Sequence, residues 1–350
     1  MGSANRVKSL NQNAKPFIVP VFIPHQGCPH RCVFCDQRSV TGRAALSPSV
    51  EYVKKGIESF LGYRREYHYP VEIAFYGGTF CGLAHDYQEA LLGTAARFVH
   101  RGVVHGIRLS TRPDTINRQE LDLLKEQSVT TVELGAQSMN DRVLFASNRG
   151  HTASDTVKAV RLVKDYGFKV GLQIMPGLPC DTEETMLDTG KKIALLRPDM
   201  VRIYPTVVLK NTRLARLFEQ GAYIPLTLEQ AVMITKKLLY LFDGCGVCVI
   251  RMGLQSTDSL SGPEGVISGP FHPSFGHLVR SAVFLDKAVG LIKNMKATRR
   301  RITFRVFPSD IPRLRGLKNS NMENLMNRFG LTDIRVTPDT AIPKDGLACE

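Results

Sequence analysis

The sequence lacks three features that would tie the protein to a membrane or to an oxidising compartment. No stretch approaches 18 uninterrupted apolar residues, so we expect no membrane-spanning helix and no membrane partner. Residues 1–16 read as a polar tail without the apolar centre of a secretory signal. Eight cysteines in a chain of 350 residues do not suggest a disulfide framework. We therefore expect a cytoplasmic protein with reduced thiols.

Acidic residues are scarce relative to basic ones. The chain has 32 Asp and Glu against 46 Lys and Arg, a formal net charge of +14. Between residues 293 and 318 a single acid, Asp310, accompanies nine basic residues: Lys293, Lys296, Arg299, Arg300, Arg301, Arg305, Arg313, Arg315 and Lys318. Such a cluster favours a polyanionic partner, usually a nucleic acid. A solvated surface without a partner is the alternative.

Hydrophobic residues make up 43% of the chain and charged residues 22%, which is enough apolar material for a core. Strand-like and helix-like segments alternate, and this alternation is typical of a parallel α/β sheet. Right-handed crossovers would close six such units into a partial barrel with an open side. The predicted strands are Phe17–Pro24, Val71–Tyr76, Gly106–Ser110, Thr130–Gly135, Lys169–Met175 and Met200–Tyr204.

The predicted fold class is therefore α/β, a partial (β/α)6 TIM-like barrel with a small basic α/β appendage at its C-terminal end. We assign residues 1–16 to the polar tail, 17–250 to the barrel and 251–350 to a basic region that closes it. Arg301–Phe307 and Thr332–Val336 read as strands of this region, and Met322–Phe329 as a helix. In barrels of this kind the chemistry lies at the C-terminal ends of the strands.

Three thiols follow the first predicted strand within eight residues. Cys28, Cys32 and Cys35 have the spacing C-x3-C-x2-C. Thiolates are soft ligands that select iron–sulfur clusters, zinc or copper(I). A structural zinc wants four ligands, whereas three cysteines on a [4Fe–4S] cube leave one iron open. We expect the cluster; a zinc site completed by His25 or His30 is the alternative, and a disulfide is disfavoured.

This spacing, with an aromatic residue before the last cysteine, resembles the radical S-adenosylmethionine (radical SAM) superfamily. The resemblance implies that the open iron binds the amino and carboxylate groups of SAM. An electron from the cluster then cleaves SAM to methionine and a 5′-deoxyadenosyl radical, which takes a hydrogen atom from the substrate. It also implies a reductant such as flavodoxin or ferredoxin. Gly77 and Gly78, after the second strand, match the superfamily turn that meets the methionine end of SAM; without side chains they let a ligand approach the backbone.

Further motifs resemble the radical SAM half of the catalytic subunit of Elongator over roughly residues 17–280. The resemblance is more distant to oxygen-independent coproporphyrinogen oxidase. It implies that Gln137, Arg149 and Gln173 line the SAM pocket and that Thr111 or Arg112 lies near the ribose. Gln offers both donor and acceptor, and Arg offers a fork for a carboxylate. The alternative is a structural role. An Arg would then pair with a neighbouring acid, and a Gln would hydrogen-bond polar groups at the end of the barrel. The motifs are Glu72–Phe80, Ser110–Asp114, Glu133–Ser138, Asn148–Thr152, Gly167–Pro179 and Leu195–Thr206.

Two departures limit what the Elongator resemblance implies. The Elongator subunit has wider spacing between its cluster cysteines, and it carries a C-terminal acetyltransferase domain for which we expect no room in 350 residues. The resemblance therefore implies radical chemistry for this chain but not the use of an acyl donor. We predict a radical SAM enzyme acting on RNA, with tRNA favoured. The alternatives are a radical SAM lyase or oxidoreductase for a small molecule, such as a modified base or tetrapyrrole precursor, and a non-catalytic iron–sulfur RNA-binding protein.

The remaining cysteines are weaker candidates. Cys245 and Cys248 form a C-x-x-C pair, which can be redox-active or half a metal site. They lie where a helix gives way to a buried-looking strand, so we expect both to be packed. Cys81 and Cys180 follow the glycine motifs and lie closer to the predicted pocket. The functional alternative for either is a fourth-site or hydrogen-donor thiol, but burial or incidental placement is favoured.

Overall fold

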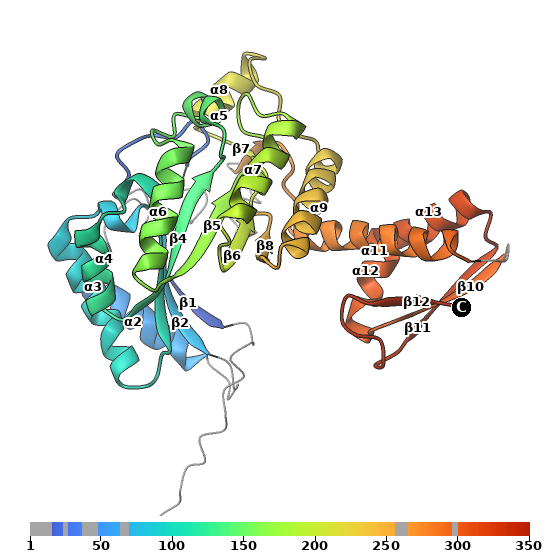
Figure 1. Cartoon of the computed structure of the whole chain (residues 1–350), viewed down its shortest axis with the longest axis horizontal. Helices are drawn as coiled ribbons and strands as arrows, with labels where there is room; N and C mark the ends of the chain where they lie inside the picture. Colours follow the sequence, from blue (N-terminus) through green and yellow to red (C-terminus); the bar gives the residue numbers. More distant parts are fainter. Residues whose placement is uncertain (1–15, 24–26, 37–47, 64–69, 256–264, 296–299) are drawn as a thin grey trace, which may run out of the picture.

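A computed structural model describes residues 16–23, 27–36, 48–63, 70–255, 265–295 and 300–350, so His25 and most of the predicted tail lie outside the described residues. Seven parallel strands form one sheet in the order β1-β2-β3-β4-β5-β6-β8 (Figure 1). The six predicted strand–helix units are confirmed, and β8 adds a strand. The strands are β1 (Phe17–Ile23), β2 (Val71–Gly77), β3 (Gly106–Thr111), β4 (Val129–Gln137), β5 (Lys169–Ile174), β6 (Met200–Ile203) and β8 (Cys248–Met252).

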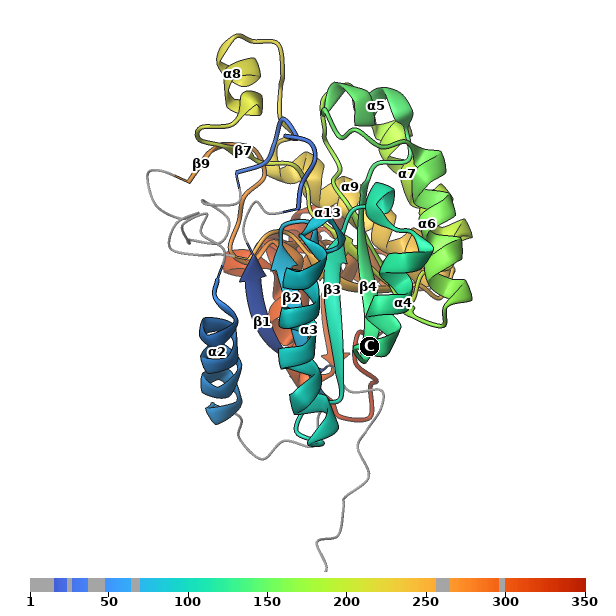
Figure 2. The same ribbon diagram turned by 90° about the vertical axis from the view of Figure 1, so that its left-hand side faces the viewer.

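Helices cover the outer, convex face of this curved sheet (Figures 1 and 2). Apolar residues at alternate strand positions, such as Ile73, Leu109 and Val132, are fully buried in one core shared with these helices. The alternation places the intervening residues on the concave face. The covering helices are α2 (Val50–Gly62), α3 (His85–His100), α4 (Arg118–Glu126), α6 (Ala153–Asp165), α7 (Glu183–Leu195) and α9 (Leu228–Gly244).

Several helices begin at a residue whose side chain caps the first turn. Ser49 caps α2, and its hydroxyl accepts a hydrogen bond from the Tyr52 backbone N–H. Thr227 and Gln230 form a reciprocal capping box at the start of α9. These caps satisfy amide groups that the first helical turn leaves unpaired. Within the described part of the chain, every helix is too short or too polar to cross a bilayer.

A short segment between β6 and α9 stands over the C-terminal ends of the strands. It contains β7 (Val208–Leu209) and α8 (Arg213–Glu219), and β7 pairs with β9 (Val266–Ser268). On the neighbouring side of the same rim, α5 (Asp141–Ala146) lies between β4 and α6. Figure 2 shows α8 and α5 at this end of the barrel. These two helices matter because the cysteine loop lies between them.

The C-terminal appendage has its own core. Phe304 and Leu325 are fully buried in a second cluster, which also contains Phe284 and Ala288 of α11 (Phe275–Lys293). The N-terminal half of α11 contributes to the barrel core, so this helix joins the two parts. The appendage lies beside α9 and β8, away from the cysteine loop (Figure 1). Its other elements are β10 (Arg301–Val306), α12 (Ile311–Arg315), α13 (Ser320–Phe329), β11 (Asp333–Pro338) and β12 (Leu347–Cys349).

The predicted strands and helix of the appendage are confirmed, and β12 is an addition. Our predicted boundary at residue 250 falls inside β8. That residues 251–350 close the barrel stays a prediction.

Candidate functional site

The cysteine loop follows β1 and lies at the C-terminal ends of the strands, between α5 and α8 (Figure 2). The middle of the loop is held from both sides by backbone hydrogen bonds. Val33 N–H donates to the Ser147 carbonyl (3.1 Å), and the Val33 carbonyl accepts from Leu214 N–H (2.7 Å). The Val33 side chain is buried with Leu214 and Tyr223 in a small cluster of its own. Val33, between Cys32 and Cys35, therefore anchors the loop, while the Cys28 thiol is exposed and those of Cys32 and Cys35 are half-buried.

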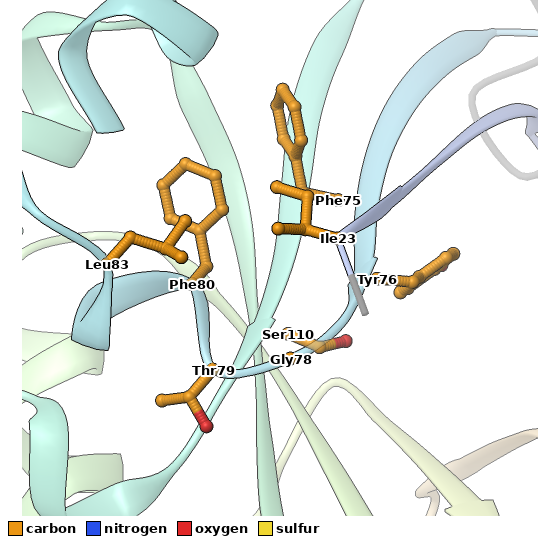
Figure 3. Close-up of a pocket in the computed structure, with 8 residues that line it drawn as sticks. All are labelled: Ile23, Phe75, Tyr76, Gly78, Thr79, Phe80, Leu83 and Ser110. Atoms are coloured by element: carbon orange, nitrogen blue, oxygen red, sulfur yellow. The ribbon is translucent and has the colours of Figure 1, made fainter. Parts of the chain in front are cut away.

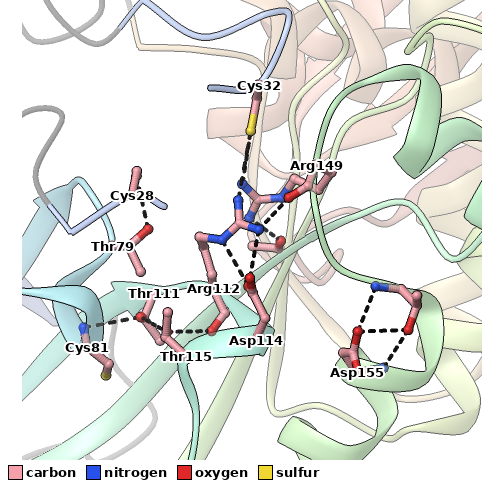
Figure 4. Close-up of polar contacts among 12 residues, drawn as sticks. Cys28, Cys32, Thr79, Cys81, Thr111, Arg112, Asp114, Thr115, Arg149 and Asp155 are labelled. Atoms are coloured by element: carbon pink, nitrogen blue, oxygen red, sulfur yellow. Dashed lines mark hydrogen bonds and ion pairs between the residues drawn. The ribbon is translucent and has the colours of Figure 1, made fainter. Parts of the chain in front are cut away.

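The start of the loop packs on the glycine turn after β2. Cys28 Sγ lies 3.0 Å from Thr79 Oγ1, within hydrogen-bond distance (Figure 4). Gly27 has a left-handed φ of +70°, and a Cβ there would lie 2.1 Å from the Thr79 carbonyl oxygen. A Cβ on Gly82 would lie 2.0 Å from the Gly27 carbonyl oxygen. The two backbones touch, so only glycine fits on either side of this contact.

This contact gives a testable prediction. In Gly82→Ala the new methyl group would overlap the Gly27 backbone, which cannot rotate away, so the cysteine loop must move off the turn. We expect the variant to retain less than half of the wild-type iron and sulfide after anaerobic reconstitution. Gly56→Ala is the matched control, because a Cβ there has no neighbour within 4 Å. Equal iron content in the two variants would show that this contact does not position the thiols.

Two arginines lie behind Cys32 (Figure 4). Arg149 Nη1 is 3.4 Å from Cys32 Sγ, and its Nη2 donates to the Gly135 carbonyl (2.7 Å). Arg112 forms a bidentate pair with Asp114, with both distances 2.9 Å, and also donates to the Arg149 carbonyl. Arg112 is only 2% exposed, so it braces Arg149 from within the protein. Arg149 Nε is buried and has no hydrogen-bond partner among the described residues, which leaves one donor available to a ligand.

The two predicted glutamines meet beside Arg149. Gln173 Nε2 donates to Gln137 Oε1 (3.2 Å). A Cβ on Gly135 would lie 2.8 Å from both Gln137 Nε2 and Arg149 Nη2, so the bare backbone of β4 makes room for both side chains. Gln137 itself has a left-handed φ of +65°, where β4 departs from its regular register with β5. The structure thus brings Gln137, Gln173 and Arg149 together at the ends of β4 and β5.

Thr111 supports the glycine turn. Its hydroxyl accepts from Cys81 N–H (3.2 Å) and contacts Thr115 Oγ1 (2.9 Å), and its side chain is 4% exposed. Thr111 therefore holds the turn that follows Gly78. That Thr111 or Arg112 lies near a ribose stays a prediction. A small pocket opens at this turn (Figure 3), lined by Ile23, Phe75, Tyr76, Gly78, Thr79, Phe80, Leu83 and Ser110.

The pKa shifts around the loop follow mainly from burial, and neighbouring charges add to or oppose them. Burial raises the pKa of the Cys35 thiol to about 12, and the nearby sulfurs of Cys32 and Cys28 add to this, while Arg149 opposes it. Burial, and then the charge of Arg149, lower the pKa of His151 to about 3, so this histidine is neutral at pH 7. Without a metal, Cys35 therefore stays protonated, and a bound cation would have to displace its proton.

The donor set fits an iron–sulfur cluster better than a single zinc ion. Ligand sulfurs of one tetrahedral zinc would lie about 3.8 Å apart, given Zn–S bonds of about 2.3 Å. Among the described residues, the one group of three or more His, Cys, Asp or Glu ligand atoms within 4.8 Å of one another is His85, Asp86 and Glu89 on the surface. The three cysteine sulfurs are therefore spread more widely. The His30 ring packs closely against Gly150, because a Cβ added at Gly150 would lie 2.2 Å from that ring.

The structure corrects one expectation about the other cysteines. Cys245 and Cys248 are both exposed, not packed: Cys245 caps the end of α9, and Cys248 opens β8 at its N-terminal end. Between them Val247 is buried instead. Cys180 is exposed and Cys81 is buried.

Residue-level prediction missed the partners that hold the site. The hydroxyl of Thr79 and the carboxylate of Asp114 contact predicted residues, and each lies one or two positions from one of them in the chain. Proximity in the chain to a predicted residue was therefore the signal that could have found Thr79 and Asp114. Ser147 and Leu214, which fix the loop through backbone atoms, carry no side-chain signal for this role.

Comparisons with known proteins agree with this geometry. The Radical SAM superfamily matches residues 22–193, and the Radical_SAM C-terminal domain matches residues 198–283. An uncharacterized protein of Methanocaldococcus jannaschii is 32% identical over 232 residues, covering 62% of this chain and 69% of the relative. A tRNA uridine(34) acetyltransferase of the same organism is 30% identical over 261 residues, covering 62% and 47%.

The chain thus spans about half the length of that acetyltransferase. Among solved structures, an N-terminally deleted Elp3 of Methanocaldococcus infernus superposes with a TM-score of 0.62 at 23% identity, covering 78% of this chain and 63% of that one. This likeness concerns the fold. The chain belongs to the radical SAM superfamily and is a radical SAM enzyme.

Proposed function

We propose that the protein modifies RNA, with tRNA as the favoured class, by radical SAM chemistry at the C-terminal end of the barrel. The observation that carries the proposal is the arrangement of Cys28, Cys32 and Cys35 on one loop, with the Arg149 guanidinium 3.4 Å from Cys32 Sγ. Three soft ligands and a partly unpaired cation suit a [4Fe–4S] cluster with one open iron and an anionic partner beside it.

In this proposal each part of the site has a defined task. Cys28, Cys32 and Cys35 ligate the cluster, which when bound supplies the electron for cleavage of SAM, received in turn from a reductant such as flavodoxin or ferredoxin. The free Nε donor of Arg149 and the amides of Gln137 and Gln173 bind polar groups of SAM. Gly77 and Gly78 let the methionine end approach the backbone. The protein orients SAM and excludes water from the reacting atoms.

Two observations support RNA as the substrate. The acetyltransferase relative is named for uridine 34 of tRNA and matches 62% of this chain. The net charge of +14 favours a polyanion. Because the match covers only 47% of that relative, its acetyl transfer is not included in the proposal.

The proposal is tested by asking whether RNA controls SAM cleavage. Protein reconstituted anaerobically is incubated with SAM, dithionite and a cell extract, either intact or treated with ribonuclease, and 5′-deoxyadenosine is quantified. We expect production to rise with intact extract and to fall to the substrate-free level after ribonuclease. Purified tRNA should restore it, and tRNA binding should weaken steeply with salt because phosphate contacts release counterions. Production that survives ribonuclease would favour the small-molecule alternative, and no production with any fraction would favour a non-catalytic protein.

A further inference from the structure

The rim around the cysteine loop exposes an aromatic ring among arginines. Phe145 on α5 is 88% exposed, although a phenylalanine gains by burial. Four exposed arginines lie on the cysteine loop and on the two helices beside it. We call these five residues the exposed rim: Phe145, Arg31, Arg142, Arg213 and Arg216.

The three segments that carry the exposed rim are physically continuous. The Ser147 and Leu214 bonds to Val33 attach the loop to the end of α5 and to the start of α8. Asn148 Nδ2 adds a bond to the Arg31 carbonyl (2.8 Å). Figure 2 shows the loop between the two helices at the end of the barrel where the strands finish. The residues of the exposed rim therefore lie on three adjoining segments at the end of the barrel that carries the candidate site.

The arginines of the exposed rim keep their charge available. None of the four forms an ion pair with another residue in the described ranges, whereas many basic residues elsewhere do. The acids on the same segments are Asp36, Asp141 and Glu219, and Asp141 accepts a hydrogen bond from Ala153 N–H (2.7 Å). A guanidinium without a carboxylate partner is suited to a phosphate.

We propose that the exposed rim binds a single-stranded segment of RNA, with the arginines on its phosphates and a base stacked on Phe145. The inference rests on the proposed RNA substrate and names the surface that would present it. Bases of a duplex are stacked inside and cannot reach a ring on a short helix, whereas unpaired bases stack on exposed aromatics with little sequence preference. An enzyme that acts on a base must receive it outside the stack, and this surface borders the candidate site.

The arginine run of the appendage is a poorer docking surface than its sequence indicates. It lies away from the cysteine loop (Figure 1). Part of its charge is neutralised: Arg313 contacts Asp310 (2.7 Å) and Asp345 (3.0 Å), and Arg305 contacts Glu350 (3.1 Å). Arg301 and Arg335, exposed on β10 and β11, thus provide a matched control for loss of charge.

The test measures binding of the cluster-loaded full chain to a fluorescent single-stranded oligoribonucleotide, its duplex form and purified tRNA. We expect Phe145→Ala to weaken single-strand binding about 5- to 100-fold, the range for loss of one stacked base, and Phe145→Tyr to retain it. Leu195→Ala, at an 81% exposed position on α7, should bind like wild type. The double variant Arg142→Ala/Arg213→Ala should lower affinity for all RNAs and make the log–log salt slope shallower by about 2, one for each lost phosphate contact.

The outcomes separate this inference from the proposed function. If the rim variants bind RNA like wild type and Arg301→Ala/Arg335→Ala loses binding, the exposed rim is not the RNA-binding surface. The proposal that RNA is the substrate would then still hold. Tighter binding of duplex than of single strand would also overturn the inference. If wild-type protein binds no RNA and its 5′-deoxyadenosine production ignores ribonuclease, the proposed function itself fails. Iron content of each variant shows that lost binding does not reflect a lost fold.

Discussion

Alanine at Cys28, Cys32 or Cys35 is expected to abolish SAM cleavage, reducing 5′-deoxyadenosine to the level of a reaction without protein. In the proposed site each substitution would remove one of three protein ligands, and the remaining two would not hold a cube that already has one open iron. Cys28 is the most exposed of the three, so its loss should disturb the fold least. A loss of activity in Cys28→Ala is then a loss of the ligand.

The matched controls are cysteines of similar exposure outside the loop. Cys180→Ala and Cys245→Ala should keep full iron, sulfide and SAM cleavage, because both thiols are exposed and neither lies on the cysteine loop. Iron and sulfide content, the cluster absorbance and 5′-deoxyadenosine are measured on the same preparations. A cluster that persists in a variant lacking all three loop cysteines, or a single zinc in anaerobically purified wild type, would contradict the assignment.

Much of the barrel was predictable because each strand carries its own signal. Short apolar runs such as Val71–Tyr76 alternate with amphipathic helices, and a parallel sheet follows from that order. The same rule places every strand end, and hence the cysteine loop, Gly77–Gly78 and Gln137, at one edge of the sheet. These are local patterns combined with a general rule of topology, so no long-range information is needed.

The contacts that fix the site were not predictable in this way. Leu214 holds Val33 across more than half of the chain through a backbone bond, which any residue type can make. The exposure of Cys245 and Cys248 was predicted wrongly because the turn between α9 and β8 buries only Val247. Sequence periodicity does not report which residue of a tight turn points inward.

A second signal was present in the strands and concerns the concave face of the sheet. Charged residues interrupt four apolar strands: Glu72 in β2, Arg108 in β3, Glu133 in β4 and Arg202 in β6. In the structure they form one buried network. Glu133 accepts a hydrogen bond from Arg108 Nη1 (3.1 Å) and forms an ion pair with Arg202 Nε (2.6 Å). Arg108 also forms an ion pair with Glu72. The network therefore links strands that are not all neighbours in the sheet.

Tyr76 extends this network toward the glycine turn. Arg202 Nη2 donates to the Tyr76 hydroxyl (2.7 Å), which itself donates to Glu133 (3.3 Å). Burial raises the pKa of Tyr76 to about 12, with Glu133 adding to the shift. Burial alone would lower the pKa of Arg202, but the carboxylate of Glu133 outweighs it and raises that pKa. Glu133 is therefore the anion on which both groups depend.

Glu133→Gln should lower the free energy of unfolding by about 3–5 kcal/mol, the usual cost of leaving a buried charge without its partner. Arg108 keeps Glu72, but Arg202, only 12% exposed, loses its carboxylate and keeps the hydroxyls of Tyr76 and Tyr204. The side chain keeps its shape, so a cavity does not explain the loss. Urea denaturation followed by circular dichroism measures the effect.

The control is a carboxylate of the same kind on the surface. Asp188 pairs with Lys192 at 2.8 Å, and both side chains are nearly half exposed, so Asp188→Asn should change stability by less than about 1 kcal/mol. If Glu133→Gln is no more costly than this control, the network is solvated and does not brace the strands. If it is as costly as expected, the strands that carry Gly77 and Gln137 are held in place by one shared anion.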